Sequence, residues 1–530
     1  MRASIILASL CALASAAISP LQINGTKFFT SNDGKQFYFK GVAYQPLSAS
    51  GQLRNEQTGS TIDDPLANPA GCAQDVKFLT DLGANAIRVY RVNATLNHDE
   101  CMQTFADAGI YLILDLETPD TTVKSDSPTW TVAQYNDFIV NLDAFRKYPN
   151  TAAFFIGNEV VDTANRTVAA PFVKAAARDM RAYQQSTSGR YIPIGYATAD
   201  VKDLQIQLAE YLSCGKPSDG IDFYGLNVYR WCGQSSYTQS GYDVIESQYK
   251  ALGRPFILSE TGCNIPVGQT RTFGELEPVY GIMADVVSGA IIYEYNQEDN
   301  MYGLVTTASV GATPTPLPDY AVLKKQWQSI SPPITMLSDY QAPGTSTIAC
   351  PPATSGFVAA TNLPPTPDSA FCACAVKNAK CSTGGTLADK DIAKAFGTVC
   401  GLNGGTACSV VTANGSSPGT YGDYSFCSGQ QQLALVYNNY YALQKSASDA
   451  CGFPGATLVG SPANAKCTHA PLAALAQSGS ASGSGGSSSA GGSTTSSGAK
   501  SASISDVRPL GLLSVGLGAV IMAVSLFVVA

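Results

Sequence analysis

The stretch Ala152-Ala-Phe-Phe-Ile-Gly-Asn-Glu159 decides the fold, because an apolar run of strand length ends abruptly in a polar pair. A strand that crosses a core and emerges with Asn158 and Glu159 holds a carboxyl group rigidly at the edge of a cleft. A second run, Pro255-Phe-Ile-Leu-Ser-Glu260, repeats the pattern later in the chain. Two rigidly held carboxyl groups are what cleavage of a glycosidic bond requires.

Similar strand-like runs recur between residues 20 and 330 and alternate with helical patterns, as at 74–82, 132–145 and 171–185. Such alternation predicts parallel strands joined by right-handed crossovers, and eight units predict an α/β fold, a (β/α)8 TIM barrel. A doubly wound sheet is the alternative, but no Gly-rich phosphate loop follows the first strand. The eight predicted strands are 37–43, 86–90, 111–115, 153–156, 192–196, 223–228, 256–259 and 290–293.

Polar and aromatic residues follow these strands, at the end where a barrel carries its chemistry. Asn and Asp suit sugar hydroxyls, and tyrosine rings suit sugar C–H faces. We expect Glu159 and Glu260, on strands four and seven, to divide the roles of proton donor and nucleophile. Asn158 is expected to hold the sugar 2-hydroxyl, and Arg88 to lie near Glu260 and keep it ionised.

The composition excludes several classes of function. Charged residues make up 14% of the chain and the net charge is −8, which argues against a nucleic-acid partner. The two histidines, His98 and His469, are predicted to be solvated loop residues outside any Ser-His-Asp triad or zinc site. We therefore expect no metal and no cofactor, and no oligomer is implied.

Both ends of the chain carry export signals. Residues 1–17 begin with Arg2, continue with an apolar run and end in small residues, as a signal peptide does. Residues 471–505 form a Ser/Gly-rich stalk and 506–530 an apolar tail, which together predict a GPI anchor attached at Ser497 or Gly498. A tail-anchored transmembrane helix is the alternative. The predicted location is the outer face of the plasma membrane, and the predicted N-glycosylation sites are Asn24, Asn93, Asn165 and Asn414.

Cysteine spacing divides the chain. Of fifteen cysteines, Cys11 lies in the signal peptide, and an even number in an oxidising compartment predicts disulfides. Eight of them fall within 371–470, and this density predicts a small, mainly helical, disulfide-rich module. A Pro/Thr/Ser-rich linker is predicted at 346–370, and the catalytic domain at 18–345. Spacing alone does not choose among the possible pairings. Zinc is disfavoured because Cys372-Ala-Cys374 has the wrong spacing.

Several longer motifs occur in the chain: Lys40-Gly-Val-Ala-Tyr-Gln-Pro46, Asp64-Pro-Leu-Ala67, Asn85-Ala-Ile-Arg-Val-Tyr90, Gly157-Asn-Glu-Val160, Ser259-Glu-Thr-Gly-Cys263 and Tyr293-Glu-Tyr295. Together these motifs resemble those of the fungal β-1,3-glucanosyltransferases of glycoside hydrolase family 72, which elongate cell-wall glucan, so the resemblance implies a location within reach of the cell wall. The resemblance implies Glu159 as acid/base and Glu260 as nucleophile. One departure is Thr261, where many relatives carry an aromatic residue. The glucan groove implied by the resemblance contains Gln45, Tyr90, Asp115, Asn158, Tyr229, Tyr293 and Tyr302.

The cysteine-rich segment resembles the X8 domain, carbohydrate-binding module family 43. Such a module either binds glucan or braces the barrel, and the sequence leaves both open. The resemblance implies the pairs Cys72–Cys101, Cys214–Cys350, Cys232–Cys263, Cys372–Cys427, Cys374–Cys467, Cys381–Cys451 and Cys400–Cys408.

The activity that the resemblance implies is cleavage of an internal β-1,3-glucan linkage, followed by transfer of the new reducing end to the non-reducing end of another chain. The expected partners are therefore donor and acceptor glucan chains. One alternative is an endo-β-1,3-glucanase, in which water replaces the acceptor. Another is a non-catalytic glucan-binding wall protein, but a binder has no need to retain both Glu159 and Glu260.

Overall fold

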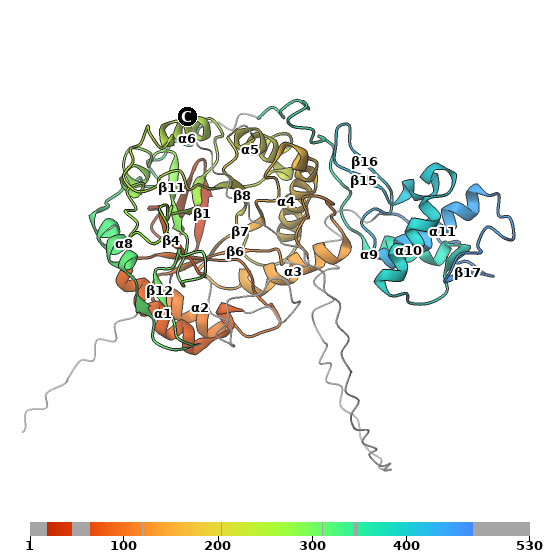
Figure 1. Ribbon diagram of the computed structural model, residues 1–530, viewed down its shortest axis with the longest axis horizontal. Coiled ribbons are helices and arrows are strands. Elements are labelled where there is room, and N and C mark those ends of the chain that lie inside the picture. Colours follow the sequence, from red (N-terminus) through yellow and green to blue (C-terminus); the bar gives the residue numbers. More distant parts are fainter. Residues whose placement is uncertain are drawn as a thin grey trace, which may run out of the picture. The chain divides into compact units, whose positions relative to one another are not determined.

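The computed structural model describes residues 18–44, 64–118, 121–202, 204–309, 311–343 and 348–469. Within these ranges, eight parallel strands close into a barrel in the order β10-β11-β4-β5-β6-β7-β8-β9 (Figure 1). This confirms the predicted (β/α)8 class. The strands are β4 (Phe39–Ala43), β5 (Ala86–Val89), β6 (Tyr111–Asp115), β7 (Thr151–Asn158), β8 (Ile194–Ala199), β9 (Phe223–Asn227), β10 (Phe256–Thr261) and β11 (Val287–Ile292).

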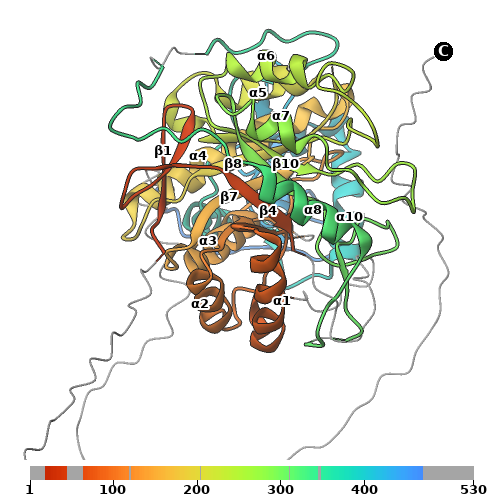
Figure 2. The ribbon, with the colours of Figure 1, turned by 90° about the vertical axis from the view of Figure 1, so that its left-hand side faces the viewer.

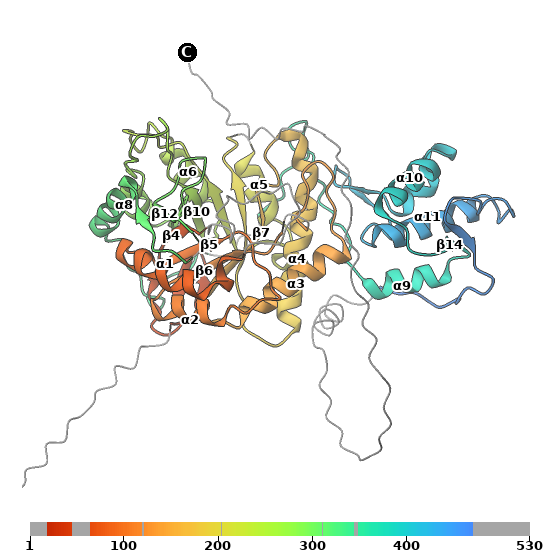
Figure 3. The ribbon, with the colours of Figure 1, turned by 60° about the horizontal axis from the view of Figure 1, so that its bottom comes forward.

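Helices cover the outside of the barrel, and local sequence explains where they begin and end (Figures 1 and 3). The capping box of Thr131 and Gln134 starts α3, and Gly83 at φ 90° ends α1 in a left-handed turn. Figure 2 shows α1 beside α2. The helices are α1 (Pro69–Leu82), α2 (Asp99–Asp107), α3 (Val132–Arg146), α4 (Ala170–Ser186), α5 (Gln205–Ser213), α6 (Tyr242–Lys250), α7 (Leu276–Tyr280) and α8 (Pro318–Ser329), with 3₁₀ turns η1 (Pro65–Ala67), η2 (Ala164–Ala169) and η3 (Pro217–Asp219).

An antiparallel sheet of β1 (Leu21–Asn24), β2 (Lys27–Thr30) and β3 (Gln36–Phe37) packs into the N-terminal end of the barrel. Its Phe28 is fully buried, with ring centroids 5.0 Å from Phe39 and 5.7 Å from Phe223. These contacts bury the apolar interior at one end of the barrel. The polar strand ends therefore remain at the opposite end, which is where barrel enzymes place their sites.

The two strands that carry the glutamates are irregular near their C-terminal ends. The pairing of β7 with β8 shifts register between Phe155 and Asn158, and that of β10 with β9 shifts between Leu258 and Glu260. Such irregularities re-aim side chains beside active sites. Both glutamates thus emerge where the regular ladder is interrupted.

A small C-terminal module has a core of its own, built on Val399, Leu433 and Val436. Its elements are α9 (Ser369–Asn378), β14 (Cys381–Thr383), α10 (Asp389–Cys400), η4 (Asn403–Val410), β15 (Ala413–Asn414), β16 (Thr420–Tyr421), α11 (Gly429–Leu443) and β17 (Ala456–Leu458). The described cysteines form seven disulfides, and the pairs are the same seven that the resemblance implied.

The segment expected to be a linker is packed against the barrel where it is described. Phe357 and Ala360 are fully buried, and the hydroxyl of Tyr211 donates to the Ala360 carbonyl. Arg178 donates to the Pro364 carbonyl at 2.9 Å. The barrel and the module belong to one compact unit of the chain. Residues 348–368 therefore connect the two and also pack against the barrel.

One histidine prediction is wrong. His98 is 2% exposed, its Nε2 lies 2.7 Å from Asp64 Oδ2, and its ring packs 4.6 Å from Phe145. Asp64 lies far enough away in sequence that local composition gave no sign of this buried pair. His469 is exposed, as predicted, and its ring stacks on that of Phe371 with the centroids 3.7 Å apart.

Several predictions fall on residues outside the described ranges: the signal peptide, Gln45, the stalk and tail, and the attachment site at Ser497 or Gly498. Among the helices that the structure does describe, none combines the length and the apolar character needed to cross a bilayer.

Candidate active site

Glu159 directly follows β7 and has a backbone conformation that is unusual for its residue type. Its φ is 52°, in the left-handed region, and its N–H donates to the Ala197 carbonyl at 2.9 Å. Non-glycine residues held in this region are found at functional sites more often than elsewhere. The side chain accepts a hydrogen bond from Asn227 Nδ2 at 2.8 Å.

The carboxyl of Glu159 is set to carry a proton near neutrality. The residue remains open to solvent, yet desolvation by the surrounding protein raises its pKa to about 7, with the negative charge of Glu260 as the second cause. The hydrogen bond from Asn227 and the charge of Arg88 act in the opposite direction. A group with such a pKa can both give and take a proton near pH 7.

Glu260, on β10, has different surroundings. It is 8% exposed and accepts hydrogen bonds from Tyr90 Oη at 2.8 Å, Tyr229 Oη at 2.8 Å and Arg88 Nη1 at 3.1 Å. A carboxylate has only acceptor sites, so three donors suit its ionised form. The same contacts also fix the direction in which its oxygens point.

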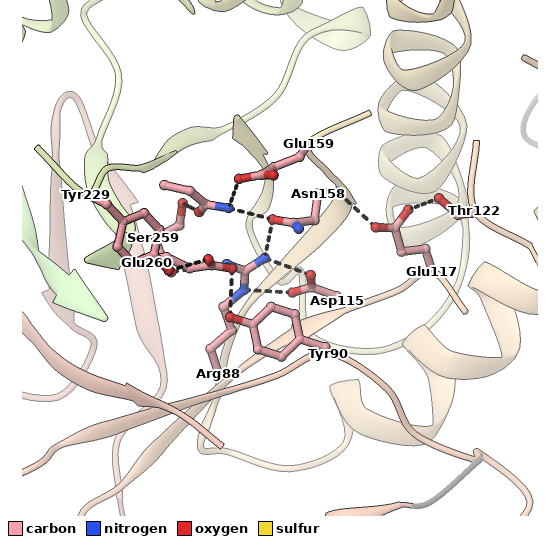
Figure 4. A network of polar contacts seen from close by, with 11 residues as sticks. Arg88, Tyr90, Asp115, Glu117, Thr122, Asn158, Glu159, Tyr229, Ser259 and Glu260 are labelled. Carbon is pink, nitrogen blue, oxygen red and sulfur yellow. Dashed lines mark hydrogen bonds and ion pairs between the residues drawn. The ribbon is translucent and has the colours of Figure 1, made fainter. Parts of the chain in front are cut away.

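Arg88 is the centre of the network in Figure 4. Its fully buried guanidinium makes a bidentate ion pair with Asp115 at 3.1 and 2.8 Å, and also donates to Asn158 Oδ1 at 3.0 Å and to the Ser259 carbonyl at 3.1 Å. A buried charge is tolerated only when it is paired and its donors are satisfied. The expected proximity of Arg88 to Glu260 is confirmed by their ion pair.

A hydrogen-bond relay connects the two catalytic strands through β9. Ser259 Oγ donates to Asn227 Oδ1 at 2.7 Å, so the amide NH₂ of Asn227 faces Glu159 Oε1 and Asn158 Oδ1, the latter at 3.0 Å. The hydroxyl thereby determines which end of the amide faces the carboxyl. Sequence reasoning missed Ser259 because its partner comes from another strand.

Three tyrosines pack edge to face beside Glu260. The ring centroids of Tyr293 and Tyr302 lie 5.3 Å apart, and those of Tyr229 and Tyr302 lie 5.6 Å apart. Tyr229 is 6.4 Å from Tyr293 and is the member that bonds Glu260. This tyrosine cluster offers aromatic surface next to the carboxylate.

Glu117, two residues beyond the end of β6, was also missed. It accepts hydrogen bonds from the Asn158 N–H at 2.9 Å and from Thr122 Oγ1 at 2.6 Å. Burial raises its pKa to about 7. The carboxyl therefore anchors the backbone just before Glu159. Its sequence signal was the pattern Asp115-Leu-Glu117 after a strand.

The structure brings most of the predicted site residues together. Gln45 lies outside the described residues, and no group of acidic, Cys and His residues suited to a metal occurs among those described. Tyr293 and Tyr302 adjoin the hydrogen-bonded network through Tyr229. The network itself contains Arg88, Tyr90, Asp115, Asn158, Glu159, Tyr229 and Glu260.

Two protein families match the sequence. The family described as glucanosyltransferase, glycoside hydrolase family 72, matches residues 10–331, which is more than half of the chain. The X8 domain matches residues 379–458. The two matches correspond to the barrel and to the cysteine-rich module.

Individual relatives extend over most of the chain. The 1,3-beta-glucanosyltransferase gas2 of Schizosaccharomyces pombe is 43% identical over 451 residues, covering 83% of this chain and 95% of the relative. Protein EPD1 of Candida maltosa is 39% identical over 463 residues, covering 87% and 82%. The structure of Saccharomyces cerevisiae Gas2p in complex with laminaritriose and laminaritetraose is 34% identical, with a TM-score of 0.73 over 83% of this chain and 97% of that chain.

Proposed function

Because the chain belongs to the glucanosyltransferase family, glycoside hydrolase family 72, we propose that it elongates β-1,3-glucan by a retaining mechanism. The single observation that carries this proposal is the contrast between two neighbouring carboxyls. Glu159 has a pKa raised to about 7, whereas Glu260 accepts three hydrogen bonds. The substrate class is supported by the laminari-oligosaccharides bound to the Saccharomyces relative.

The first half-reaction breaks an internal linkage of the donor chain. A carboxylate oxygen of Glu260 attacks the anomeric carbon and forms a glucosyl ester, while the bond from that carbon to the leaving oxygen breaks. Glu159, protonated, gives its proton to the leaving oxygen. Arg88 and the two tyrosine hydroxyls orient Glu260 for the attack.

The second half-reaction returns the enzyme to its starting state. Glu159, now ionised, takes the proton from the 3-hydroxyl of an acceptor chain, and that oxygen attacks the anomeric carbon. The ester bond to Glu260 breaks, and Glu260 leaves as a carboxylate. Two inversions at one carbon retain its configuration. A pKa near 7 suits both the giving and the taking of a proton by Glu159.

The remaining network residues would bind the glucan. Asn158 is assigned to the 2-hydroxyl at the cleavage point, a contact that strengthens in the transition state. Tyr293 and Tyr302 are assigned to stacking on sugar rings of the acceptor. Gln45, Tyr90, Asp115 and Tyr229 complete the proposed groove, with Arg88 positioning the carboxyls.

Transfer and hydrolysis share the first half-reaction and differ only in the attacking hydroxyl. Incubation with reduced laminari-oligosaccharides, followed by sizing of the products, separates the candidate functions. We expect products longer than the substrate. Only shorter products would indicate an endo-glucanase, and an unchanged substrate would indicate a binding protein.

The assigned location is the outer face of the plasma membrane, with a GPI anchor at Ser497 or Gly498 after removal of residues 1–17. The seven disulfides of the described residues support export, because such bonds form in oxidising compartments. The sequon residues Asn24, Asn165 and Asn414 are exposed and Asn93 is half-buried, which suits N-glycosylation. Mass spectrometry of the purified protein before and after phospholipase and glycosidase treatment tests each of these assignments.

The X8 module is assigned a bracing role for the barrel. The Val132 N–H donates to the Phe426 carbonyl at 2.9 Å, and Phe172 packs edge to face on Tyr421 at 5.8 Å. These contacts connect α3 and α4 to the module. If the module instead contributed glucan affinity, substitutions of its exposed aromatic residues would weaken binding to insoluble glucan without lowering thermal stability.

A further inference from the structure

We propose that Arg271, held by Asp319, is a positioning residue that orders the acceptor-binding tyrosines and thereby favours transfer over hydrolysis. The inference rests on the proposed function and concerns a residue outside the hydrogen-bonded network around Glu260. Neither residue carried a signal in the sequence.

The guanidinium of Arg271 connects the ends of three chain segments. Its Nη1 donates to the carbonyls of Tyr293 at 2.7 Å and Gly262 at 3.2 Å, and its Nη2 donates to the Tyr302 carbonyl at 2.6 Å. Gly262 lies two residues after Glu260. One side chain therefore ties the backbones of both proposed acceptor tyrosines to the strand that carries the nucleophile.

Asp319 holds Arg271 from the other side. It is near the start of α8, and its carboxylate accepts from Arg271 Nε at 2.5 Å and from the Arg271 backbone N–H at 3.0 Å. Arg271 is 4% exposed, and its guanidinium also lies 4.7 Å above the Phe273 ring. Each of the three guanidinium nitrogens donates to at least one acceptor, so the side chain has little freedom to release the two tyrosine carbonyls.

The loop that ends at Tyr302 is also fastened by Asn300. Its Oδ1 accepts from the Tyr302 N–H at 3.2 Å, and its carbonyl accepts from Asn264 Nδ2 at 2.8 Å. The Tyr302 carbonyl receives a second donor, the Glu294 N–H, at 3.2 Å. The position of Tyr302 thus depends on contacts with the loops after β10 and β11. Arg271 is the side chain that donates hydrogen bonds to the backbone of both loops.

The contacts of Arg271 are expected to affect binding of the acceptor glucan rather than cleavage of the donor glucan. A water molecule can attack the glucosyl-enzyme without an aromatic surface, whereas a glucan hydroxyl competes with water only when its chain is held in place. Displacement of Tyr293 and Tyr302 should therefore slow transfer more than hydrolysis. Lysine cannot replace Arg271, because a single ammonium does not reproduce the planar fork that reaches several acceptors.

The test compares Arg271→Lys with the unaltered full chain on reduced laminari-oligosaccharides, with longer and shorter products quantified at several acceptor concentrations. We expect the ratio of transfer to hydrolysis to fall by about tenfold, with a higher apparent KM for acceptor, because misplaced binding groups lose effective concentration. Asp319→Asn should also lower the ratio of transfer to hydrolysis, by a smaller factor than Arg271→Lys.

Arg181→Lys provides a matched control. Arg181 is a largely buried arginine on α4 that donates to Asp222 at 2.6 Å and to the Gly220 carbonyl at 2.8 Å, just before β9 begins and so at the other end of the barrel. Its replacement should alter thermal stability to a similar degree and leave the transfer ratio unchanged.

Two results would overturn the inference: an unchanged transfer ratio in Arg271→Lys, or an equal fall of the ratio in Arg181→Lys. Should Arg271→Lys fail to fold, Asp319→Asn decides the matter by the same ratio. Failure of the proposed function is distinguishable, because the unaltered protein would then yield no longer products at all.

Discussion

Two glutamates end two strands of one barrel, yet their surroundings differ in nearly every respect. Glu260 is buried and receives three donors from Arg88, Tyr90 and Tyr229. Glu159 is open to solvent and, among the described residues, its side chain accepts one hydrogen bond, from the Asn227 amide. The difference shows that identical side chains obtain different hydrogen-bond partners and exposure from neighbours on other strands, and for Glu159 these surroundings raise the pKa to about 7. Donors favour a carboxylate, whereas desolvation beside another negative charge favours a carboxylic acid.

The largest effect is expected from removal of either carboxyl. Glu159→Gln and Glu260→Gln should each lower kcat on laminari-oligosaccharides by about ten-thousandfold while leaving the fold intact. An aryl glycoside donor separates the two roles, because a good leaving group needs no proton. On this donor Glu159→Gln should still release the aryl group in a pre-steady-state burst, and Glu260→Gln should not. A burst from Glu260→Gln instead would reverse the assignment.

The next largest effect is expected at Arg88, which in the described part of the chain donates a hydrogen bond to Glu260 but none to Glu159. Arg88→Lys keeps the charge but loses the fork that reaches Asp115, Asn158 and Glu260 together, so we expect kcat/KM to fall by about a hundredfold. Circular dichroism and thermal unfolding serve as the check on folding. Activity close to that of the unaltered protein would mean that the tyrosine hydroxyls suffice to orient Glu260.

A smaller effect concerns pH. Glu159 must be protonated for the first half-reaction, so cleavage should decline as the pH rises through about 7. Asn227→Ala removes a donor that stabilises the ionised form of Glu159. The pKa of Glu159 should then rise further, and the basic limb of the kcat/KM profile should move to higher pH by roughly half to one unit. A limb that stays in place or moves to lower pH would assign it to another group.

The same raised pKa has a consequence for stability. Folding favours the protonated form of Glu159, so its contribution is fully present below the unfolded pKa near 4.5 and is lost as the pH rises through about 7. Glu159→Gln removes this titration. The free energy of unfolding of the variant should therefore decline less between pH 5 and pH 8, as measured by denaturant titration, and an identical decline in both proteins would contradict the raised pKa.

The smallest effect is expected at Ser259. Ser259→Ala frees the Asn227 amide to rotate, and we expect a loss of about threefold to tenfold in kcat/KM, the equivalent of one neutral hydrogen bond. Ser259→Thr, which keeps the hydroxyl, is the matched control and should retain more activity. Equal activity in both variants would show that the amide keeps its orientation without the hydroxyl.

Much of the fold followed from local patterns. Apolar runs of strand length and helical stretches between them predicted eight strands, and the structure differs mainly at their boundaries. Runs such as 111–115 are legible because a buried parallel strand is apolar throughout. The strand expected at 37–43 is instead divided into β3 and β4, since Gln36 and Phe37 pair with the hairpin strand β2.

The parts of the site that were missed share one cause. Ser259, Glu117 and Arg271 act on residues that are distant in sequence or on backbone atoms, and neither kind of partner leaves a trace in local composition. His98 was misjudged for the same reason, because its partner Asp64 is separated from it in sequence by helix α1 and strand β5. Long-range contacts are decided by packing, and packing is not a local property.

The sequence by itself determined the order of strands and helices, the strand ends at which Glu159 and Glu260 stand, and the division into a barrel and a cysteine-rich module. Periodicity, strand length and cysteine spacing are properties of neighbouring residues, so they can be read along the chain. The tertiary structure alone decided that Glu260 lies among three donors and that Glu159 has one. The pKa of a carboxyl depends on burial and on charges brought from other strands, and these exist only once the barrel has closed.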